Sequence, residues 1–132
     1  MKILLLFFST LLYFSPNNEK TYIKEFYANK KIKAEGWIQF NKKQDYWYFY
    51  NENGSVKEEG HYINNKKTKW WIFYNSKNVI LRKCEFTNDK QDGFSIIYEN
   101  GDVVKAEKYT FGKKIKEWQS IAEFKKDNTD LL

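Results

Sequence analysis

The chain has one cysteine, one histidine, one proline and one arginine, and the scarcity of each residue type argues against a class of structure or binding site. A single cysteine, Cys84, forbids an intramolecular disulfide, so stability must come from packing. A lone histidine, His61, without a second cysteine at ligand spacing excludes the usual His/Cys metal sites, and we expect neither a metal nor another cofactor. One proline and six glycines are too few for a collagen-like or low-complexity chain.

The sequence also lacks a constellation of catalytic residues. Glu58 and Glu59 are adjacent, and neighbours on a strand point to opposite faces, so they cannot form a paired acid/base site by themselves. We expect cross-strand ion pairs from both carboxylates, an exposed strand position for His61 and a buried, inert thiol for Cys84. We therefore predict that the protein is not an enzyme.

Aromatic residues and lysine are abundant instead. Aromatics make up 20% of the chain against 42% for all hydrophobic residues, so aromatic side chains supply much of the core. Basic residues outnumber acidic ones by 23 to 17, and 22 of the 23 are lysine. The net charge of +6 favours anionic partners without choosing between nucleic acid, lipid and acidic protein, and an AT-rich genome would also enrich lysine.

The N-terminal segment 1–16 has the shape of a secretory signal peptide. Lys2 supplies one positive charge, and the apolar run at 3–14 is shorter than the roughly 20 residues that span a bilayer as a helix. We expect export to the periplasm or cell surface. The alternatives are a buried first strand of a cytoplasmic protein and an uncleaved, weakly anchored N-terminus.

A repeat of 23–24 residues runs through the domain at 17–126. The units are 22–45, 46–69, 70–92 and 93–116, followed by a partial capping unit at 117–126 and a frayed tail at 127–132. One residue is missing from one unit, and we place this shortening in a turn between Phe86 and Phe94. The aligned positions, which we interpret as structural rungs, are Trp47, Trp71, Phe94 and Trp118; Gly54, Asn78 and Gly101; and Tyr62, Phe86 and Tyr109.

Each unit reads as a β-hairpin. Strand-like aromatic and β-branched segments flank Asn53-Gly54 and Asn100-Gly101, and Asn-Gly is a strong hairpin signal because tight turns need φ > 0. Consecutive hairpins joined by short polar turns predict an all-β, elongated antiparallel meander of about four stacked hairpins. Since one hairpin cannot bury enough apolar surface alone, neighbouring units must share their core.

Strand alternation assigns the side chains to two faces. Trp47 and Phe49 share one face, which we predict to be concave and filled, while Tyr48 and Tyr50 share the other, half-exposed with their hydroxyls in water. The tail has two interpretations, since the repeat predicts a strand at Trp118 and the spacing of Trp118, Ile121, Ala122 and Lys125 fits a helix. A capping strand is the favoured of the two.

Lysine pairs recur near the turns between units and are expected along one edge of the sheet. They could form a solvated edge that resists aggregation, or a stripe that binds anionic headgroups. These lysines are Lys42, Lys43, Lys66, Lys67, Lys113 and Lys114.

The segments GHYINNKKTKWWIFYNSKN and DGFSIIYENGDVVKAEKYTFGKK resemble the MORN repeat in its bacterial variant form, over about residues 30–118. Trp47, Tyr50, Asn53-Gly54, Gly60 and Tyr62 match that variant, and the glycine that precedes its tryptophan is retained as Gly93. The resemblance implies an elongated antiparallel sheet that binds other proteins or membrane phospholipid. Some bacterial relatives are antitoxins.

Together these features predict a non-catalytic β-repeat binding or scaffold protein of the bacterial cell envelope. It would contact an unknown protein partner through an aromatic sheet face that includes Tyr48, Tyr50 and Tyr74, together with the lysine edge. The alternatives are a peripheral protein that binds an anionic membrane surface through the lysine edge, and a cytosolic antitoxin-like neutraliser of a partner protein. Nucleic acid is not expected, because a stacking platform would need more arginine than Arg82 alone.

Overall fold

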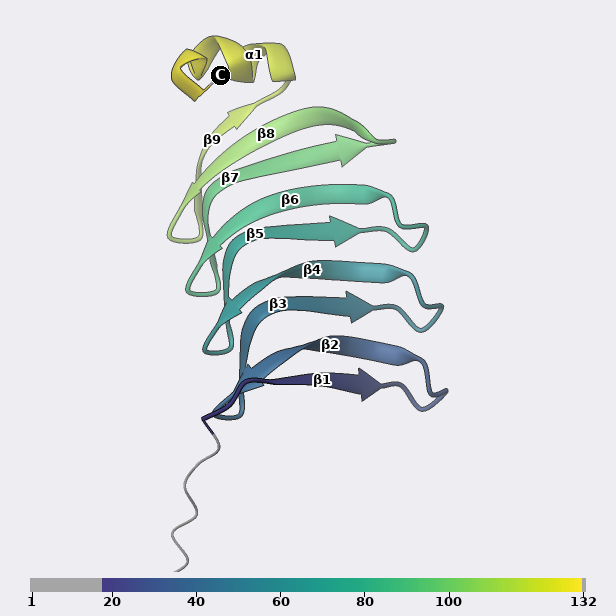
Figure 1. The fold of residues 1–132 in the computed structure, drawn as a ribbon. Coiled ribbons are helices and arrows are strands. Elements are labelled where there is room, and N and C mark those ends of the chain that lie inside the picture. The colour runs from purple at the N-terminus through teal and green to yellow at the C-terminus, as the bar shows by residue number, and fades with distance from the viewer. Residues whose placement is uncertain (1–17, 132) are drawn as a thin grey trace, which may run out of the picture.

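A computed structural model describes residues 18–131 as one nine-stranded antiparallel sheet followed by a short helix (Figure 1). Each strand pairs only with its neighbours in sequence, so the predicted meander of stacked hairpins is confirmed. The candidate signal segment lies outside the described residues, and among those described no helix could cross a membrane. The elements are β1 (Thr21–Phe26), β2 (Ile32–Gln39), β3 (Lys42–Tyr50), β4 (Val56–Ile63), β5 (Lys66–Tyr74), β6 (Ile80–Thr87), β7 (Lys90–Glu99), β8 (Asp102–Thr110), β9 (Lys113–Trp118), α1 (Ile121–Asp127) and a 3-10 turn (Thr129–Leu131).

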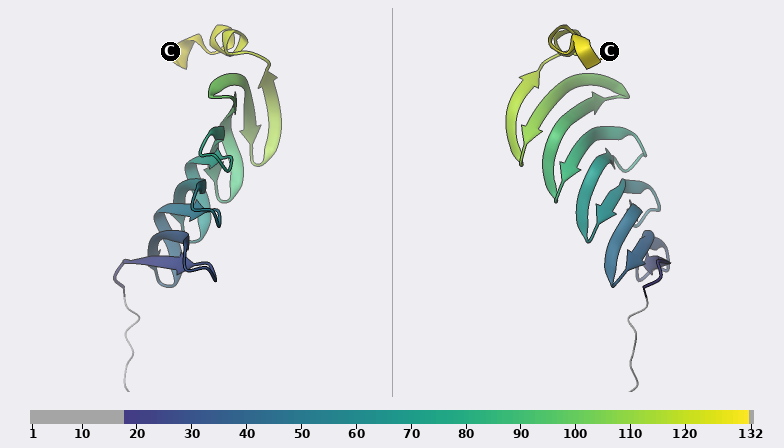
Figure 2. Two further views of the ribbon diagram at one scale, coloured as in Figure 1. Left: turned by 90° about the vertical axis from the view of Figure 1, so that its right-hand side faces the viewer. Right: turned by 60° about the vertical axis from the view of Figure 1, so that its left-hand side comes forward.

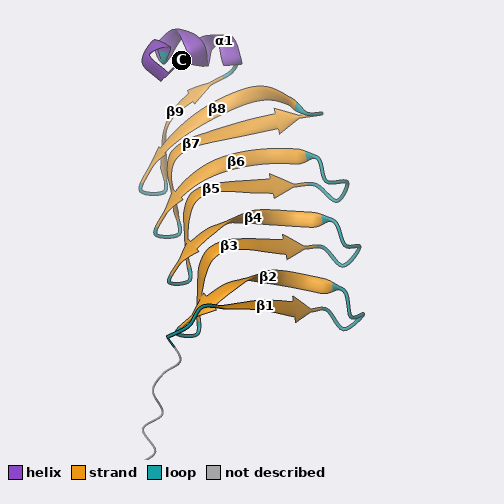
Figure 3. Cartoon of the chain, in the orientation of Figure 1, coloured by secondary structure: helices purple, strands orange, loops and turns teal. Residues whose placement is uncertain are grey.

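Tight two-residue turns connect the units along one side of the sheet (Figure 3). Asn64-Asn65 is typical, with φ of 49° and 67°, the left-handed conformation that asparagine tolerates and a primed hairpin turn requires. The turns are also bonded to one another across units, since Asn65 Oδ1 accepts a hydrogen bond from the backbone N–H of Lys43 at 2.6 Å. Asp89 accepts in the same way from Lys67 N–H, so this row of turns is a continuous ladder.

The one-residue shortening lies in a different turn from the one predicted. Tyr50 is opposite Val56 and Tyr74 is opposite Ile80, but Tyr98 is opposite Val103. The 24-residue step between equivalent positions therefore continues from Tyr50 through Tyr74 to Tyr98. The missing residue belongs to the β7–β8 hairpin, where the two-residue turn Asn100-Gly101 replaces the longer turns of the earlier hairpins.

This register corrects the predicted tryptophan column. Trp71 is opposite Cys84, and Cys84 is opposite Ser95, so Ser95 occupies the position that the sequence alignment gave to Phe94. Phe94 and Trp118 lie on the other face of the sheet. The alignment failed here because the aromatic residue Phe94 was preferred over the serine that directly follows it.

Strands β3, β5 and β7 each bend next to the tight turns (Figure 2). Asp45, Lys69 and Gly93, which occupy equivalent positions in successive units, all have positive φ, at 56°, 59° and 119°. In β3 the pairing with β2 jumps from Trp47 to Gln44, which is a bulge of the type that bends a strand. Gly93 is thus equivalent to Asp45 and Lys69, and the left-handed bend explains the glycine.

Most of the core lies on one side of this single-layered sheet, and Ala106 and Trp118 are buried on the other side. Trp47 and Trp71 have 0% exposure, and each indole N–H donates to a backbone carbonyl of the preceding strand, at 2.9 and 3.0 Å. Each ring lies against a glycine of that strand: a Cβ on Gly36 or Gly60 would come 2.4 Å from the ring. The predicted filled tryptophan side is confirmed for these two residues.

The tail beyond Trp118 forms a helix, so the favoured capping strand is wrong. Ser120 caps the helix by accepting from the N–H of Glu123, whose carboxylate accepts in turn from Gln119 N–H at 2.8 Å. Phe124 then packs edge-on against Trp118, with ring centres 5.1 Å apart, and against Phe94. This helix stands over the β9 end of the sheet (Figure 1), whereas no described element covers the outer edge of β1.

Candidate binding face

The sheet has two chemically different faces. We call one the tryptophan face and the other the tyrosine face, and the strand register assigns each residue to one of them. The tryptophan face contains Trp47, Phe49, Glu58, Tyr62, Lys67, Trp71, Phe73, Cys84, Phe86, Ser95, Lys105, Glu107, Tyr109, Lys114 and Glu117. The tyrosine face contains Glu35, Trp37, Tyr46, Tyr48, Tyr50, Glu59, His61, Trp70, Ile72, Tyr74, Lys83, Ile96 and Tyr98.

Several charged side chains of the tryptophan face are paired with one another. Lys67 Nζ lies 3.3 Å from Glu58 Oε1 and 4.1 Å from the centre of the Trp71 ring. At the other end, Lys105 and Lys114 both bridge Glu107 and Glu117, and the shortest of these pairs is Lys114–Glu117 at 2.6 Å. Hydrogen bonds from Lys114 and then Lys105 lower the pKa of Glu117 to about 2. Lys43 and Arg82 lie over the Trp47 and Phe73 rings of this face and have no ion pair with any described residue.

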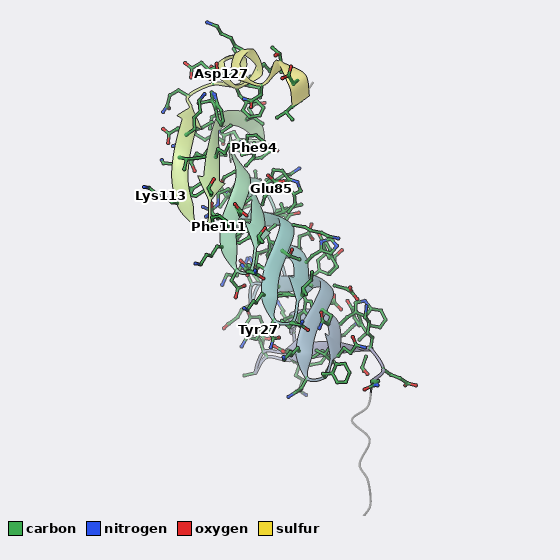
Figure 4. The ribbon with its side chains drawn as sticks, turned by 90° about the vertical axis from the view of Figure 1, so that its left-hand side faces the viewer. Tyr27, Glu85, Phe94, Phe111, Lys113 and Asp127 are labelled. Carbon is green, nitrogen blue, oxygen red and sulfur yellow. The ribbon has the colours of Figure 1, made fainter. Side chains whose placement is uncertain are left out.

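The predicted lysine edge is therefore split in two. Lys43, Lys67 and Lys114 point to the tryptophan face, where Lys43 covers the Trp47 ring at 5.0 Å from its centre. The strand alternation explains this, because the two members of each lysine pair must point to opposite faces. Lys42, Lys66 and Lys113 are exposed at the starts of β3, β5 and β9, and Figure 4 shows Lys113 beside Phe111 where β8 turns into β9. Lys90 occupies the same place on β7 and was missed, because its turn has a single lysine.

Tyrosine hydroxyls on the tyrosine face are bonded to carboxylates. Tyr50 Oη donates to Glu35 Oε1 at 2.7 Å, and Tyr74 Oη donates to Glu59 Oε1 at 3.0 Å. The prediction that these hydroxyls are in water is wrong. Burial, together with the hydrogen bond to Glu59 and its charge, raises the pKa of Tyr74 to about 12, and burial with the bond to Glu35 raises the pKa of Tyr50. Both phenols are thus fixed as protonated donors.

At the equivalent position of the next unit, a lysine replaces the glutamate that accepts the tyrosine hydrogen bond. Lys83 occupies the position of Glu59 one unit earlier and Glu35 two units earlier, and its Nζ lies 5.8 Å from the centre of the Tyr98 ring. Glu35 has an ion pair with Lys24 at 3.6 Å. Within residues 18–131, neither Glu59 nor Lys83 has an ion-pair partner of its own. Glu59, which accepts the Tyr74 hydrogen bond, and Lys83 are therefore two charged groups of this face that no ion pair neutralises.

An apolar hollow lies between two units on the same face. It has a volume of ≈ 330 Å³, and its lining residues are Trp70, Ile72, Lys83, Ile96 and Tyr98. Trp70 is 39% exposed, which is unusual for a residue of this size on a strand in the middle of a sheet. Sequence reasoning selected Tyr48, Tyr50 and Tyr74 here and missed Trp70 and Ile72, although these two follow Tyr46 and Tyr48 by one full repeat.

The remaining candidate residues have structural roles. The ring of His61 packs edge-on against Tyr46 at 4.8 Å, so this histidine is half-buried rather than exposed, and burial followed by the charge of Lys69 lowers its pKa. Cys84 Sγ is buried 3.1 Å from Ser95 Oγ, and burial raises the pKa of the thiol, which makes it inert. Among the described residues no cluster of His, Cys, Asp and Glu could hold a metal ion.

Comparison with known proteins adds no relative: no family model matches the chain, and no curated protein matches its sequence.

Proposed function

We propose that this chain is a non-catalytic binding protein that contacts a protein partner through its tyrosine face. The observation that supports this most is the contrast between the two faces. The tryptophan face buries Trp47 and Trp71 completely, while the tyrosine face leaves Trp70 39% exposed at an apolar hollow that Lys83 also lines. Protein interfaces are enriched in aromatic residues, and tryptophan and tyrosine are common among the residues that contribute most binding energy.

Site-specific photo-cross-linking in the native cell tests this proposal. A photoreactive phenylalanine analogue at Ile72 samples the tyrosine face, and the same analogue at Lys105 samples the tryptophan face as a matched control. We expect a discrete protein adduct from position 72, none from position 105, and loss of the adduct when Tyr74→Ala is added to a chain that still folds. Adducts from position 105 alone would contradict the proposal.

A second candidate function is association with an anionic membrane surface. One observation favours it, the row of exposed lysines Lys42, Lys66, Lys90 and Lys113 beside the tight turns. Such a row should bind vesicles that contain phosphatidylglycerol at low salt and release them at physiological ionic strength. Replacement of all four by glutamine should abolish vesicle binding and leave the cross-link at position 72 intact.

The cellular setting is part of the proposal. The signal-like segment and the motif resemblance support a MORN-like repeat protein of the bacterial cell envelope. Intact mass spectrometry on protein from the native cell tests the location: loss of about 15–20 residues in an extracytoplasmic fraction supports export. A full-length mass from the cytosol would instead favour the antitoxin-like alternative.

A further inference from the structure

We propose that the partner segment is proline-rich and binds in the polyproline II conformation, running along the stack of strands across Tyr50, Tyr74 and Tyr98. This inference rests on the proposed function and names the chemistry of its partner. It follows from the spacing of the three tyrosines, from the apolar hollow beside Tyr98 and from the charges of Glu59 and Lys83.

The spacing selects the conformation of the ligand. Tyr50, Tyr74 and Tyr98 are equivalent residues of β3, β5 and β7, so consecutive rings are two strands apart. Two strand spacings measure roughly 9.4–9.8 Å. A polyproline II helix repeats every three residues, or about 9.3 Å, so every third residue meets an equivalent tyrosine. An α-helix repeats every ~5.4 Å and a β-strand every ~6.6 Å, and neither period matches the tyrosines.

The surface chemistry suits proline. Aromatic-lined grooves bind proline-rich segments because the ligand is already extended and loses little conformational entropy. Hydrogen bonds to Glu35 and Glu59 hold the Tyr50 and Tyr74 rings in place before a ligand arrives. Beside Tyr98, Ile72 and Ile96 line the hollow of ≈ 330 Å³ that could receive a proline ring.

The charges of Glu59 and Lys83 add a requirement on the sequence of the ligand. Glu59 belongs to the Tyr74 position and Lys83 to the Tyr98 position, so the two charges are one repeat apart. One repeat corresponds to three residues of polyproline II. The preferred ligand therefore has a basic and an acidic residue three positions apart in a proline background. Either chain direction satisfies this, because the basic residue can come first or second.

Calorimetric titration with synthetic peptides tests the inference, using the chain in the form recovered from its native cell. The probe is a twelve-residue peptide with arginine and glutamate three positions apart and proline elsewhere. Control peptides place the two charges two or four positions apart, or replace every proline by glycine. We expect the probe to bind at least fivefold tighter than the shifted peptides, and the glycine peptide to lose at least tenfold.

Matched variants locate the site. Tyr74→Ala should weaken the probe at least tenfold, and Glu59→Gln or Lys83→Gln should remove the preference for three-residue spacing. Lys105→Ala on the tryptophan face should change nothing, and circular dichroism confirms that each variant folds. Equal binding of the glycine peptide, or a probe that ignores Tyr74→Ala, would overturn the inference.

The two proposals fail in different ways. A probe that does not bind, together with a cross-link at position 72, overturns the proline-rich ligand and leaves the tyrosine face as a protein-binding surface. Absence of both the peptide binding and the cross-link overturns both proposals.

Discussion

The indole ring of Trp71 lies against Gly60 on the neighbouring strand, so close that a Cβ on Gly60 would come 2.4 Å from the ring. Gly36 and Trp47 repeat the arrangement one unit earlier. The missing methyl group is what lets a large ring lie flat and fully buried on a sheet that is one layer thick.

Gly60→Ala should therefore be strongly destabilising. The ring is enclosed and cannot shift, so we expect a loss of about 1–3 kcal/mol or more in the free energy of unfolding. Urea denaturation measures it. Gly54→Asn is the matched control, because nothing lies within 4 Å of a Cβ there and asparagine tolerates the positive φ. Equal stability of Gly60→Ala and the wild type would contradict this packing.

The next pair along the sheet, on β6 and β7, has Cys84 and Ser95 in place of glycine and tryptophan, and these two residues divide the volume differently. Cys84→Gly alone should leave a void, and Ser95→Trp alone should clash with Cys84. The double variant should rebuild the pair of the earlier units. A double-mutant cycle should then give a favourable coupling of about 0.5–3 kcal/mol, and additive effects would contradict the equivalence.

Lys69→Gly should stabilise the protein. Lys69 has φ of 59°, a conformation that costs a residue with a Cβ roughly 1–2 kcal/mol. We expect a gain of about 1 kcal/mol over Lys69→Ala, which removes the same charge and keeps the Cβ. Thermal denaturation of the two variants decides it, and a higher melting temperature for the alanine variant would refute the argument.

Phe124→Ala should release the C-terminal helix. Its ring contacts both Trp118 and Phe94, and it is only part-buried, so we expect about 1–3 kcal/mol, below the ~3–5 kcal/mol typical of a buried phenylalanine. Hydrogen exchange should accelerate in β9. Lys125→Ala, an exposed neighbour in the same helix, should leave exchange in β9 unchanged.

The single histidine should titrate below its ordinary pKa of 6.5. Burial and the charge of Lys69 lower the pKa of His61, while Asp45 opposes this shift. Because the unfolded chain then binds the proton more readily, stability should fall as pH drops from about 6.5 through the folded pKa. NMR titration of the imidazole checks this directly, and a pKa above 6.5 would contradict it.

The hairpins were predictable because their signals are local. Asn53-Gly54 and Asn100-Gly101 both mark turns that the structure contains. The register of β7 could not be predicted in this way, because Ser95 is a weaker match to the tryptophans than its neighbour Phe94. The position of Tyr98 indicates the correct register, since Tyr98 follows Tyr74 by the same number of residues as Tyr74 follows Tyr50.

The side-chain contacts were less accessible to sequence reasoning. The Tyr74–Glu59 bond joins residues 15 apart through two strands, and their meeting depends on turn lengths and bulges. The capping helix had a local signal in Ser120 and Glu123. Its position is decided by the packing of Phe124 against Phe94, which is a contact between segments more than one repeat unit apart in the chain.

The strict neighbour-to-neighbour order of the strands also decides how the molecule would respond to a pulling force. β1 and α1 lie at opposite ends of the stack (Figure 1), so a force that pulls them apart acts on the strand pairs in series. In such an array each unit contacts only its neighbours, so folding can begin at any unit and propagate from there.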